Sequence, residues 1–448
     1  MPIIYLPIVR DNHPWASPFG VEVNAGRLAV PSIKERAIQL GASWHRVNGG
    51  VSWKAVQPAE GDPYNWTALL RLDRDIQAAQ LANMTPIVIV DDYPHWATLN
   101  IPYATSCGPL RADYFDEYAA FLTALVERYK QPPYNVHYWE LGNEVDIDPS
   151  LVAPNSIFGC WGNINDPYYG GEHYGEMLKA VVPAIRQADP DAKILIGGLL
   201  LHTHQSTDLT YGTPEHFFEG VLRSGAAPYF DIVAYHGYPS YGNVQVDYDL
   251  IHPVWAPLGG IVVGKARFLQ DVMDRYGIDK PLFLNESGLL CTPPFVECEP
   301  PPHHFFEAQA DHIVRSFTRG LGNGVDQVTW YTLNGPGWRS GGLLDDAQEP
   351  KLVYTAYQQL IKQTYGAAIP PMYMNHGVDR VEGYRFNRRT FVVDVLWSRD
   401  STSRLVNVPS TQFLAAYTRD GQPITPVTVD CNVQISVGFS PVYVQLRP

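Results

Sequence analysis

The 448-residue chain lacks a long apolar run and has few positive charges. No segment approaches the ~20 consecutive apolar residues that a membrane-spanning helix requires. Lys and Arg number 32 against 46 Asp and Glu, which gives a formal net charge of −14, and no basic cluster occurs. Because nucleic-acid binding relies on clustered Lys and Arg, these absences argue against both a membrane-embedded protein and a nucleic-acid partner. They favour a neutral substrate.

Cysteine is scarce, and a recognisable export signal is absent. The first fifteen residues lack the basic start and long apolar run of a secretory signal peptide. Cys291 and Cys298 enclose a short Pro-containing loop that a disulfide could close, and Cys107 and Cys160 fall in two loops that would be neighbours in a barrel. Cys431 would be left over, and five free thiols are the alternative. Disulfides would favour a secreted or extracytoplasmic protein, with a cytoplasmic location left open.

The glycine-rich G-x-G-x-x-G turn of a doubly wound sheet is also missing after the first apolar run. Instead, eight Val-, Ile- and Leu-rich runs alternate with amphipathic helical patterns. The expected strands are 19–23, 43–48, 85–90, 136–144, 193–198, 230–236, 281–286 and 326–333. The expected helices are near 32–40, 66–82, 112–129, 174–188, 214–223, 262–276, 306–321 and 354–365. Strands of this kind, each followed by a helix, predict a parallel (β/α)8 TIM barrel, with a doubly wound open sheet as the alternative.

The pattern changes after Pro370 and Pro371, where apolar residues recur at every second position, as in 384–397 and 442–448. Such alternation is typical of half-buried antiparallel strands. We therefore expect three parts: an N-terminal extension (1–18), a catalytic α/β barrel (19–368) and a small C-terminal, β-sandwich-like antiparallel domain (369–448).

Two acidic strings, ELGNEV at 140–145 and LFLNES at 282–287, close the expected fourth and seventh strands. Active sites of TIM barrels lie at the C-terminal ends of the strands, so Glu144 and Glu286 would face each other across the barrel mouth. A two-carboxylate glycosidase needs one carboxyl to protonate the leaving oxygen and another to attack the sugar. The alternative, a pair of structural ion-paired glutamates, is weaker for two residues at these strand ends, each preceded by Asn.

With these residues, positions 19–365 resemble clan A of the glycoside hydrolases, in particular family 39 and the cellulase-like family 5. The resemblance implies that Glu144 is the acid/base, that Glu286 is the nucleophile, and that Asn143 hydrogen-bonds the sugar 2-hydroxyl. It implies a retaining hydrolase of β-glycosidic bonds that uses no cofactor. Double displacement requires carboxyl groups about 5 to 5.5 Å apart, whereas inversion requires about 6.5 to 9.5 Å.

Four further residues match the clan by position. Arg46 ends the second expected strand and resembles the arginine that keeps the nucleophile ionised, with a structural salt bridge as the alternative. His236 and Tyr238 form the His-x-Tyr after the sixth strand, where the Tyr orients the nucleophile and the His approaches the substrate. Trp330 on the eighth strand resembles the Trp that floors the sugar subsite, with core packing as its alternative.

The loop after the third strand reads DDYPHW and contains Asp91, Asp92, His95 and Trp96. Their position alone makes them candidate substrate contacts, with His95 and Trp96 the two we select.

A metal centre is a competing interpretation, because His202 and His204 follow the fifth strand and His303 adjoins His304. Metal-dependent hydrolases on this fold usually need a His pair at the first strand, where this chain has Glu22 and Asn24. We therefore expect no catalytic metal.

The predicted function is an exo-acting, β-xylosidase-like retaining glycosidase of carbohydrate metabolism or polysaccharide degradation. Its partner would be an oligosaccharide or polysaccharide, and its oligomeric state is left open. An endo-acting β-glucanase or mannanase is the alternative within this class, and a catalytically silent glycan-binding barrel is the alternative outside it. Long loops at about 145–172, 237–261, 287–304 and 334–352 would wall a pocket or deep cleft.

Overall fold

The computed structural model describes residues 17–99, 108–147, 156, 158–159, 161–201, 212–291, 298 and 300–448. Eight parallel strands lie within these ranges: β1 (Phe19–Asn24), β2 (Trp44–Ser52), β3 (Thr85–Asp91), β4 (Tyr138–Leu141), β5 (Lys193–Ile196), β6 (Val233–Gly237), β7 (Leu282–Ser287) and β8 (Gln327–Trp330). They are hydrogen-bonded in the order β5-β4-β3-β2-β1-β8-β7-β6. Two parallel bridges, Leu195 with Ile232 and Leu199 with Tyr235, join the remaining edges. The predicted TIM barrel is confirmed.

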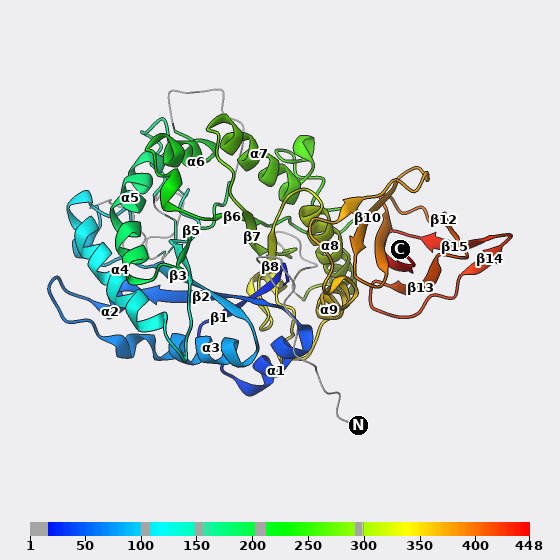
Figure 1. The fold of residues 1–448 in the computed structure, drawn as a ribbon, viewed down its shortest axis with the longest axis horizontal. Helices are drawn as coiled ribbons and strands as arrows, with labels where there is room; N and C mark the ends of the chain where they lie inside the picture. Colours follow the sequence, from blue (N-terminus) through cyan, green and yellow to red (C-terminus); the bar gives the residue numbers. More distant parts are fainter. Residues whose placement is uncertain are drawn as a thin grey trace.

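Helices surround this barrel (Figure 1). They are α1 (Pro31–Leu40), α2 (Trp53–Val56), α3 (Leu70–Leu81), α4 (Phe115–Tyr129), α5 (Gly171–Ala188), α6 (Pro214–Arg223), α7 (Ile261–Arg275), α8 (His303–Leu321) and α9 (Leu352–Thr364). Proline in the first turn starts α1 and α6, where the missing N–H costs nothing. Gly41, at φ 82°, ends α1 in the left-handed conformation.

The barrel interior changes character along its axis. Near the N-terminal ends of the strands it is filled by an apolar layer that includes Trp44, Ile87, Leu195, Ala234 and Phe283. Two residues beyond Trp44 on β2, the same face carries Arg46, which is 1% exposed. Side chains alternate across a strand, so the apolar layer supports a charged layer at the C-terminal ends.

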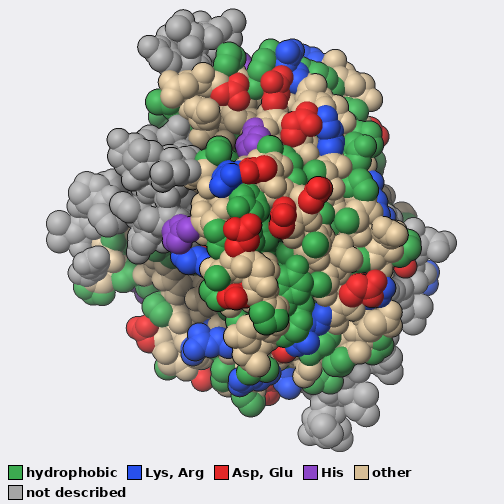
Figure 2. All heavy atoms as spheres, turned by 90° about the vertical axis from the view of Figure 1, so that its left-hand side faces the viewer, with side chains coloured by type: hydrophobic (Ala, Val, Ile, Leu, Met, Phe, Trp, Pro, Cys, Tyr) green, Lys and Arg blue, Asp and Glu red, His purple; other side chains and the backbone are tan. Residues whose placement is uncertain are grey.

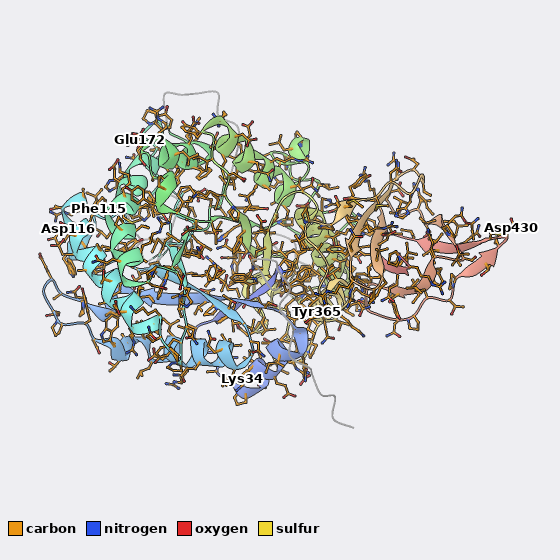
Figure 3. All side chains as sticks on the ribbon, viewed as in Figure 1. Lys34, Phe115, Asp116, Glu172, Tyr365 and Asp430 are labelled. Atoms are coloured by element: carbon orange, nitrogen blue, oxygen red, sulfur yellow. A yellow bond between two sulfur atoms is a disulfide. The ribbon has the colours of Figure 1, made fainter. Side chains whose placement is uncertain are left out.

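The C-terminal domain consists of two antiparallel sheets. One contains β9 (Met372–Tyr373), β10 (Val381–Asn387), β11 (Val392–Ser398), β13 (Phe413–Thr418) and β16 (Val442–Leu446), and the other contains β12 (Arg404–Pro409), β14 (Val427–Val429) and β15 (Asn432–Val437). Both contribute to one apolar core, for example Leu396 from the first sheet and Ile435 from the second. Figure 3 shows Asp430, in the β14–β15 turn, far from the barrel, whereas Tyr365 at the end of α9 lies near the junction.

The domain junction runs along α8 and α9 and has an apolar part, in which Tyr384, Phe386 and Trp397 join the barrel core, and a polar part. Arg419 donates to Asp311 at 2.8 Å and to the Glu307 carboxylate at 2.8 Å, both on α8. Gln445 donates to Gln363 of α9 at 2.8 Å. The C-terminal domain is therefore joined to the barrel both by apolar packing and by specific side-chain pairs.

The surface and the cysteines add two observations. The face in Figure 2 carries charged side chains of both signs, interspersed among other residues. Among the described residues, no helix is long and apolar enough to cross a membrane. Cys291 and Cys298 form the expected disulfide, and Cys431 is free and exposed. The expected partners Cys107 and Cys160 lie outside the described residues, as do His202 and His204.

Candidate active site

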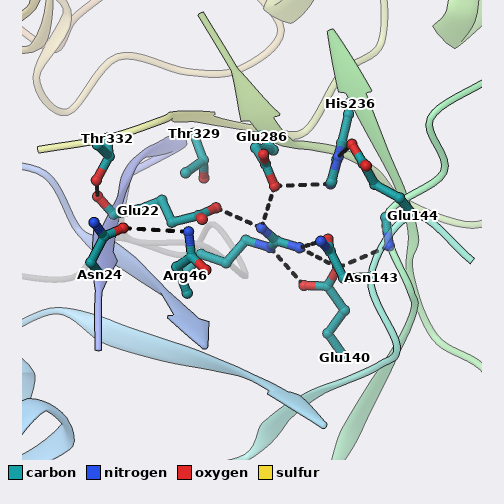
Figure 4. Close-up of polar contacts among 12 residues, drawn as sticks. Glu22, Asn24, Arg46, Glu140, Asn143, Glu144, His236, Glu286, Thr329 and Thr332 are labelled. Carbon is teal, nitrogen blue, oxygen red and sulfur yellow. Dashed lines mark hydrogen bonds and ion pairs between the residues drawn. The ribbon is translucent and has the colours of Figure 1, made fainter. Parts of the chain in front are cut away.

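Arg46 organises the charged layer at the barrel mouth (Figure 4). Its Nε and Nη2 donate to the two oxygens of Glu140 at 2.8 and 2.9 Å. Nη1 donates to Glu22 at 2.5 Å and to Glu286 at 2.6 Å, and Nη2 also donates to the Asn143 amide oxygen at 2.6 Å. A guanidinium carries five N–H bonds, and all five are used here. Arg46 thus ties together β1, β4, β7 and the turn after β4.

Glu286 lies near the C-terminal end of β7 and accepts hydrogen bonds on both carboxylate oxygens. Arg46 donates to Oε2, and the Tyr238 hydroxyl donates to Oε1 at 2.5 Å. Donors to both oxygens fix the orientation of the Glu286 carboxyl group. The side chain remains 12% exposed, so the carboxyl group is presented to the barrel mouth.

Glu144 lies three residues beyond the end of β4, not at the end of the strand as its sequence position predicted. Gly142, at φ 94°, and Glu144, at φ 50°, turn the chain there. The Glu144 N–H donates to the carbonyl of Gly198 at 2.9 Å, which fixes the turn against the segment after β5. The side chain is 14% exposed, and burial raises the pKa of Glu144 to about 7. Glu144 can therefore hold a proton near neutral pH.

His236 lies between the two glutamates. Its Nδ1 is 2.9 Å from Glu144 Oε1, and its Nε2 is 3.5 Å from Glu286 Oε2. Burial lowers the pKa of His236 to about 4, so the ring is neutral at physiological pH. It is completely buried and contacts both carboxyl groups.

Gly198 makes room for this histidine. A Cβ at position 198 would collide with the His236 ring. The Gly198 N–H also donates to Glu140 at 2.9 Å. One residue without a side chain therefore contacts Glu140 and Glu144 through its backbone and admits His236 alongside them.

The two glutamates are close together. Glu144, His236 and Glu286 each offer one atom that could bind a metal, a carboxylate oxygen or an imidazole nitrogen, and these three atoms lie within 4.8 Å of one another. No other such group of three or more His, Cys, Asp or Glu residues occurs in the described part of the chain. These atoms could in principle hold a metal ion. Both Glu286 oxygens, however, already accept from Arg46 or Tyr238, and the guanidinium charge opposes a second cation. The arrangement fits proton transfer better than metal binding.

Three predicted site residues lie apart from this network. Trp330 is completely buried, and its ring contacts Phe317 and His312 of α8. A role as the floor of a sugar subsite does not fit this position. Trp96 packs edge to face against Trp53, with ring centroids 5.1 Å apart. His95 is exposed beside it.

The segment that follows the eighth strand supplies other aromatic rings to this region. Tyr331 follows Trp330 and therefore faces the opposite way; its ring centroid is 6.2 Å from that of Tyr238. Trp338, in the following loop, is 51% exposed, and its ring centroid is 6.3 Å from that of Tyr238. Among the described residues, Trp338 thus presents an exposed aromatic ring beside Tyr238, whose hydroxyl donates to Glu286.

Sequence reasoning also missed three buried ionisable groups around the two catalytic candidates. Glu22 and Glu140 contact Arg46 directly. Lys265 of α7 donates to the carbonyls of Leu200 and His236 at 2.5 and 2.8 Å. Side chains alternate between the two faces of a strand, and this alternation could have predicted that Glu22 and Glu140 point into the barrel. Each lies an even number of residues from another inward-facing position. Nothing in the sequence near Lys265 marked its destination.

No family model and no curated protein sequence matches this chain. Solved structures do match. A family 39 glycoside hydrolase from Bacteroides cellulosilyticus has a TM-score of 0.70 at 16% identity, over 96% of this chain and 81% of that one. A monomeric β-xylosidase from Caulobacter crescentus has a TM-score of 0.61 at 15% identity, over 97% and 96%. A family 30 subfamily 8 xylanase from Clostridium acetobutylicum has a TM-score of 0.62 at 14% identity, over 96% and 95%.

The likeness is one of fold. It extends through the C-terminal domain, because nearly the whole chain is covered in each comparison. The predicted resemblance to family 39 is confirmed at this level.

Proposed function

We propose that the protein is a retaining glycoside hydrolase that cleaves β-glycosidic bonds with Glu286 as nucleophile and Glu144 as acid/base. The observation that carries this proposal is the pair of carboxyl groups at the barrel mouth, with oxygens within 4.8 Å and with different surroundings. The short spacing favours double displacement over inversion, which leaves room for a water molecule between the carboxyls. The match to glycoside hydrolase structures supports the same conclusion.

In the first step, Glu286 attacks the anomeric carbon while Glu144 gives its proton to the leaving oxygen. Arg46 and Tyr238 hold the Glu286 carboxylate ionised and oriented. Burial keeps Glu144 largely protonated up to about pH 7. Two identical side chains thus receive opposite protonation states from their surroundings, as acid and nucleophile require.

In the second step, Glu144, now ionised, removes a proton from the water that releases the sugar from Glu286. His236, neutral and bonded to Glu144 through Nδ1, keeps this carboxyl oriented in both steps. The Asn143 amide oxygen accepts from Arg46, so its NH2 group is the end that donates to the sugar 2-hydroxyl.

For the substrate, we propose an exo-acting, β-xylosidase-like activity on an oligosaccharide or polysaccharide, with an endo-acting β-glucanase or mannanase as the alternative. Matched structures named as a β-xylosidase and a xylanase support a pentose-containing substrate. Trp338 takes the place proposed earlier for Trp330, because its exposed ring offers an apolar face for a sugar. The disulfide between Cys291 and Cys298 supports an extracytoplasmic location.

A panel of 4-nitrophenyl β-glycosides tests this function, with β-xyloside expected to be cleaved fastest. Proton NMR of the first product should show the β-anomer, because double displacement retains configuration. The matched control is the double variant Glu144→Gln/Glu286→Gln, which should be inactive. An initial α-anomer would refute the retaining mechanism. Sugar binding without cleavage of any glycoside would identify a silent glycan-binding barrel.

A further inference from the structure

The charges around Arg46 do not balance. Three carboxyl groups, from Glu22, Glu140 and Glu286, contact a single guanidinium. Glu22 and Glu140 are buried, and Glu286 is nearly so. Ionised carboxyls are costly away from water unless each is paired or hydrogen-bonded. One cation cannot neutralise three such anions.

The three carboxyls differ in the hydrogen bonds that they accept. Glu140 accepts two N–H bonds from Arg46 and one from Gly198. Although burial acts in the opposite direction, Arg46 holds the pKa of Glu140 below its usual value. Glu286 accepts from Arg46 and Tyr238. Glu22 accepts from Arg46 through a single N–H, which belongs to the same Nη1 that serves Glu286.

The other groups around Glu22 do not compensate its charge. Glu140 of β4 and Glu286 of β7 interact with it as like charges, and Arg46 of β2 is its cation. Tyr238, after β6, and Tyr331, after β8, also face Glu22 and stay neutral, because burial raises the pKa of both phenols. Burial and the charge on Glu286 together raise the pKa of Glu22 well above its usual value, against the opposing effect of Arg46.

We propose that Glu22 is a positioning residue that carries a proton throughout the reaction, as a neutral carboxylic acid whose carbonyl oxygen accepts from Arg46 Nη1. A neutral Glu22 holds the guanidinium in place by a hydrogen bond and does not offset the positive charge of Arg46. The positive charge of Arg46 is then shared by two carboxylates. Glu140 holds the guanidinium on the β4 side, and the guanidinium keeps Glu286 ionised for attack. The assignment of Glu286 as nucleophile rests on the proposed function, whereas the proton on Glu22 does not.

Infrared spectroscopy tests the proton directly, since a protonated carboxyl absorbs apart from a carboxylate. Isotopic labelling of glutamate side-chain carboxyls separates them from aspartates such as Asp91, whose pKa burial raises to about 8. The Glu144→Gln variant, which removes the glutamate whose pKa burial raises to about 7, should retain a protonated glutamate band at pH 7. Adding Glu22→Gln should remove that band. Absence of the band in Glu144→Gln, or its persistence after Glu22→Gln, would overturn the proposal whether or not the protein is a glycosidase.

Activity supplies a second readout that a purely space-filling role would not give. An amide mimics a neutral acid, so the kcat of Glu22→Gln should be roughly tenfold or more above the kcat of Glu22→Ala. Glu140 provides the matched control on the same guanidinium. There the charge itself is required, so Glu140→Gln and Glu140→Ala should lose kcat to a similar extent. Equal losses for Gln and Ala at position 22 would show that its negative charge is needed and would refute a neutral Glu22.

Discussion

Several buried arginines in the described part of the chain contact three carboxyl groups each, and Arg46 and Arg319 are two of them. Arg46, at the barrel mouth, contacts Glu22, Glu140 and Glu286. Arg319, on α8, contacts three other acids. It donates to Asp247 at 2.7 Å and to Asp249 at 3.1 Å, both in the segment between β6 and α7, and to Glu382 of β10 at 2.9 Å.

The two clusters differ in what solvent can reach. The carboxylates of Asp247, Asp249 and Glu382 are 9%, 0% and 4% exposed. Their ion pairs with Arg319 connect a helix, a loop and a strand of the C-terminal domain. At Arg46, Glu286 and the neighbouring Glu144 are 12% and 14% exposed at the barrel mouth. Charge burial alone therefore does not identify a catalytic site. The partly open carboxyl pair at the barrel mouth is the feature on which our proposed catalytic site rests.

The largest difference between the two clusters should appear when the two partly open carboxyl groups, of Glu286 and Glu144, are replaced one at a time. Glu286→Gln should reduce kcat by roughly four orders of magnitude or more for every leaving group, because no glycosyl-enzyme can form. Glu144→Gln should still be glycosylated by substrates with acidic phenol leaving groups, which need little protonation, but deglycosylation becomes slow. Burst kinetics should then show an accumulating intermediate.

Azide provides the control for these roles. It attacks the intermediate without base assistance and should accelerate turnover of Glu144→Gln. Rescue of Glu286→Gln by azide, with Glu144→Gln unresponsive, would reverse the two roles. Unaltered activity in both variants would place the catalytic site elsewhere.

Replacing each arginine by Met should separate activity from stability. Arg319→Met leaves buried carboxylates without their cation and should lower the free energy of unfolding by about 3–5 kcal/mol. The folded fraction should keep kcat within about tenfold, whereas Arg46→Met should lose more than about a hundredfold. Urea denaturation and kinetics at 15 °C measure both quantities under conditions where the variants are folded. A catalytic loss in Arg319→Met that equals that in Arg46→Met would remove the distinction.

The smallest expected effect is a shift in pH dependence. Glu144 acts when protonated, so kcat/KM should fall as pH rises through its pKa of about 7. Burial dominates this raised pKa, and the Lys265 charge opposes it. Lys265→Met should therefore raise the pKa of Glu144 and move the alkaline limb to higher pH by a fraction of a unit.

Lys351 is the matched control for Lys265, because burial likewise lowers its pKa to about 8, while its charged neighbours are Asp345 and Asp346. Lys351→Met should leave the alkaline limb in place. A limb that moves to lower pH in Lys265→Met would show that the charge of Lys265 does not act on Glu144.

The sequence was sufficient to predict the barrel and the residues that converge on its mouth. Strand order alone placed Glu144 and Glu286 at the same end, and the resemblance to clan A pointed to Arg46 and Tyr238. Trp330 shows the limit of this reasoning. Gln327 and Thr329 on the same strand hydrogen-bond to each other at 2.6 Å on one face, so Trp330 lies on the opposite face, against α8.

The partners of Arg46 could not be derived from local pattern. They depend on register, which sets Glu22 opposite Arg46 and Glu140 opposite Ile89. The turn at Gly142 and Glu144 was also missed, because a continuous apolar run does not reveal where hydrogen bonding to β5 stops. The protonation states follow from burial, which only the assembled barrel determines.

The ion pairs along α8 bear on whether the barrel can be used without its C-terminal domain. Arg319 holds the segment that follows His236 and Tyr238, and one of its three carboxyl partners, Glu382, belongs to the C-terminal domain. Arg419, also from that domain, neutralises Asp311 and Glu307 on the same helix. A barrel excised at the end of α9 would retain every catalytic side chain but would expose uncompensated charges on α8. The two domains are thus one unit for protein engineering, and exchange of the C-terminal domain requires these ion pairs to be rebuilt.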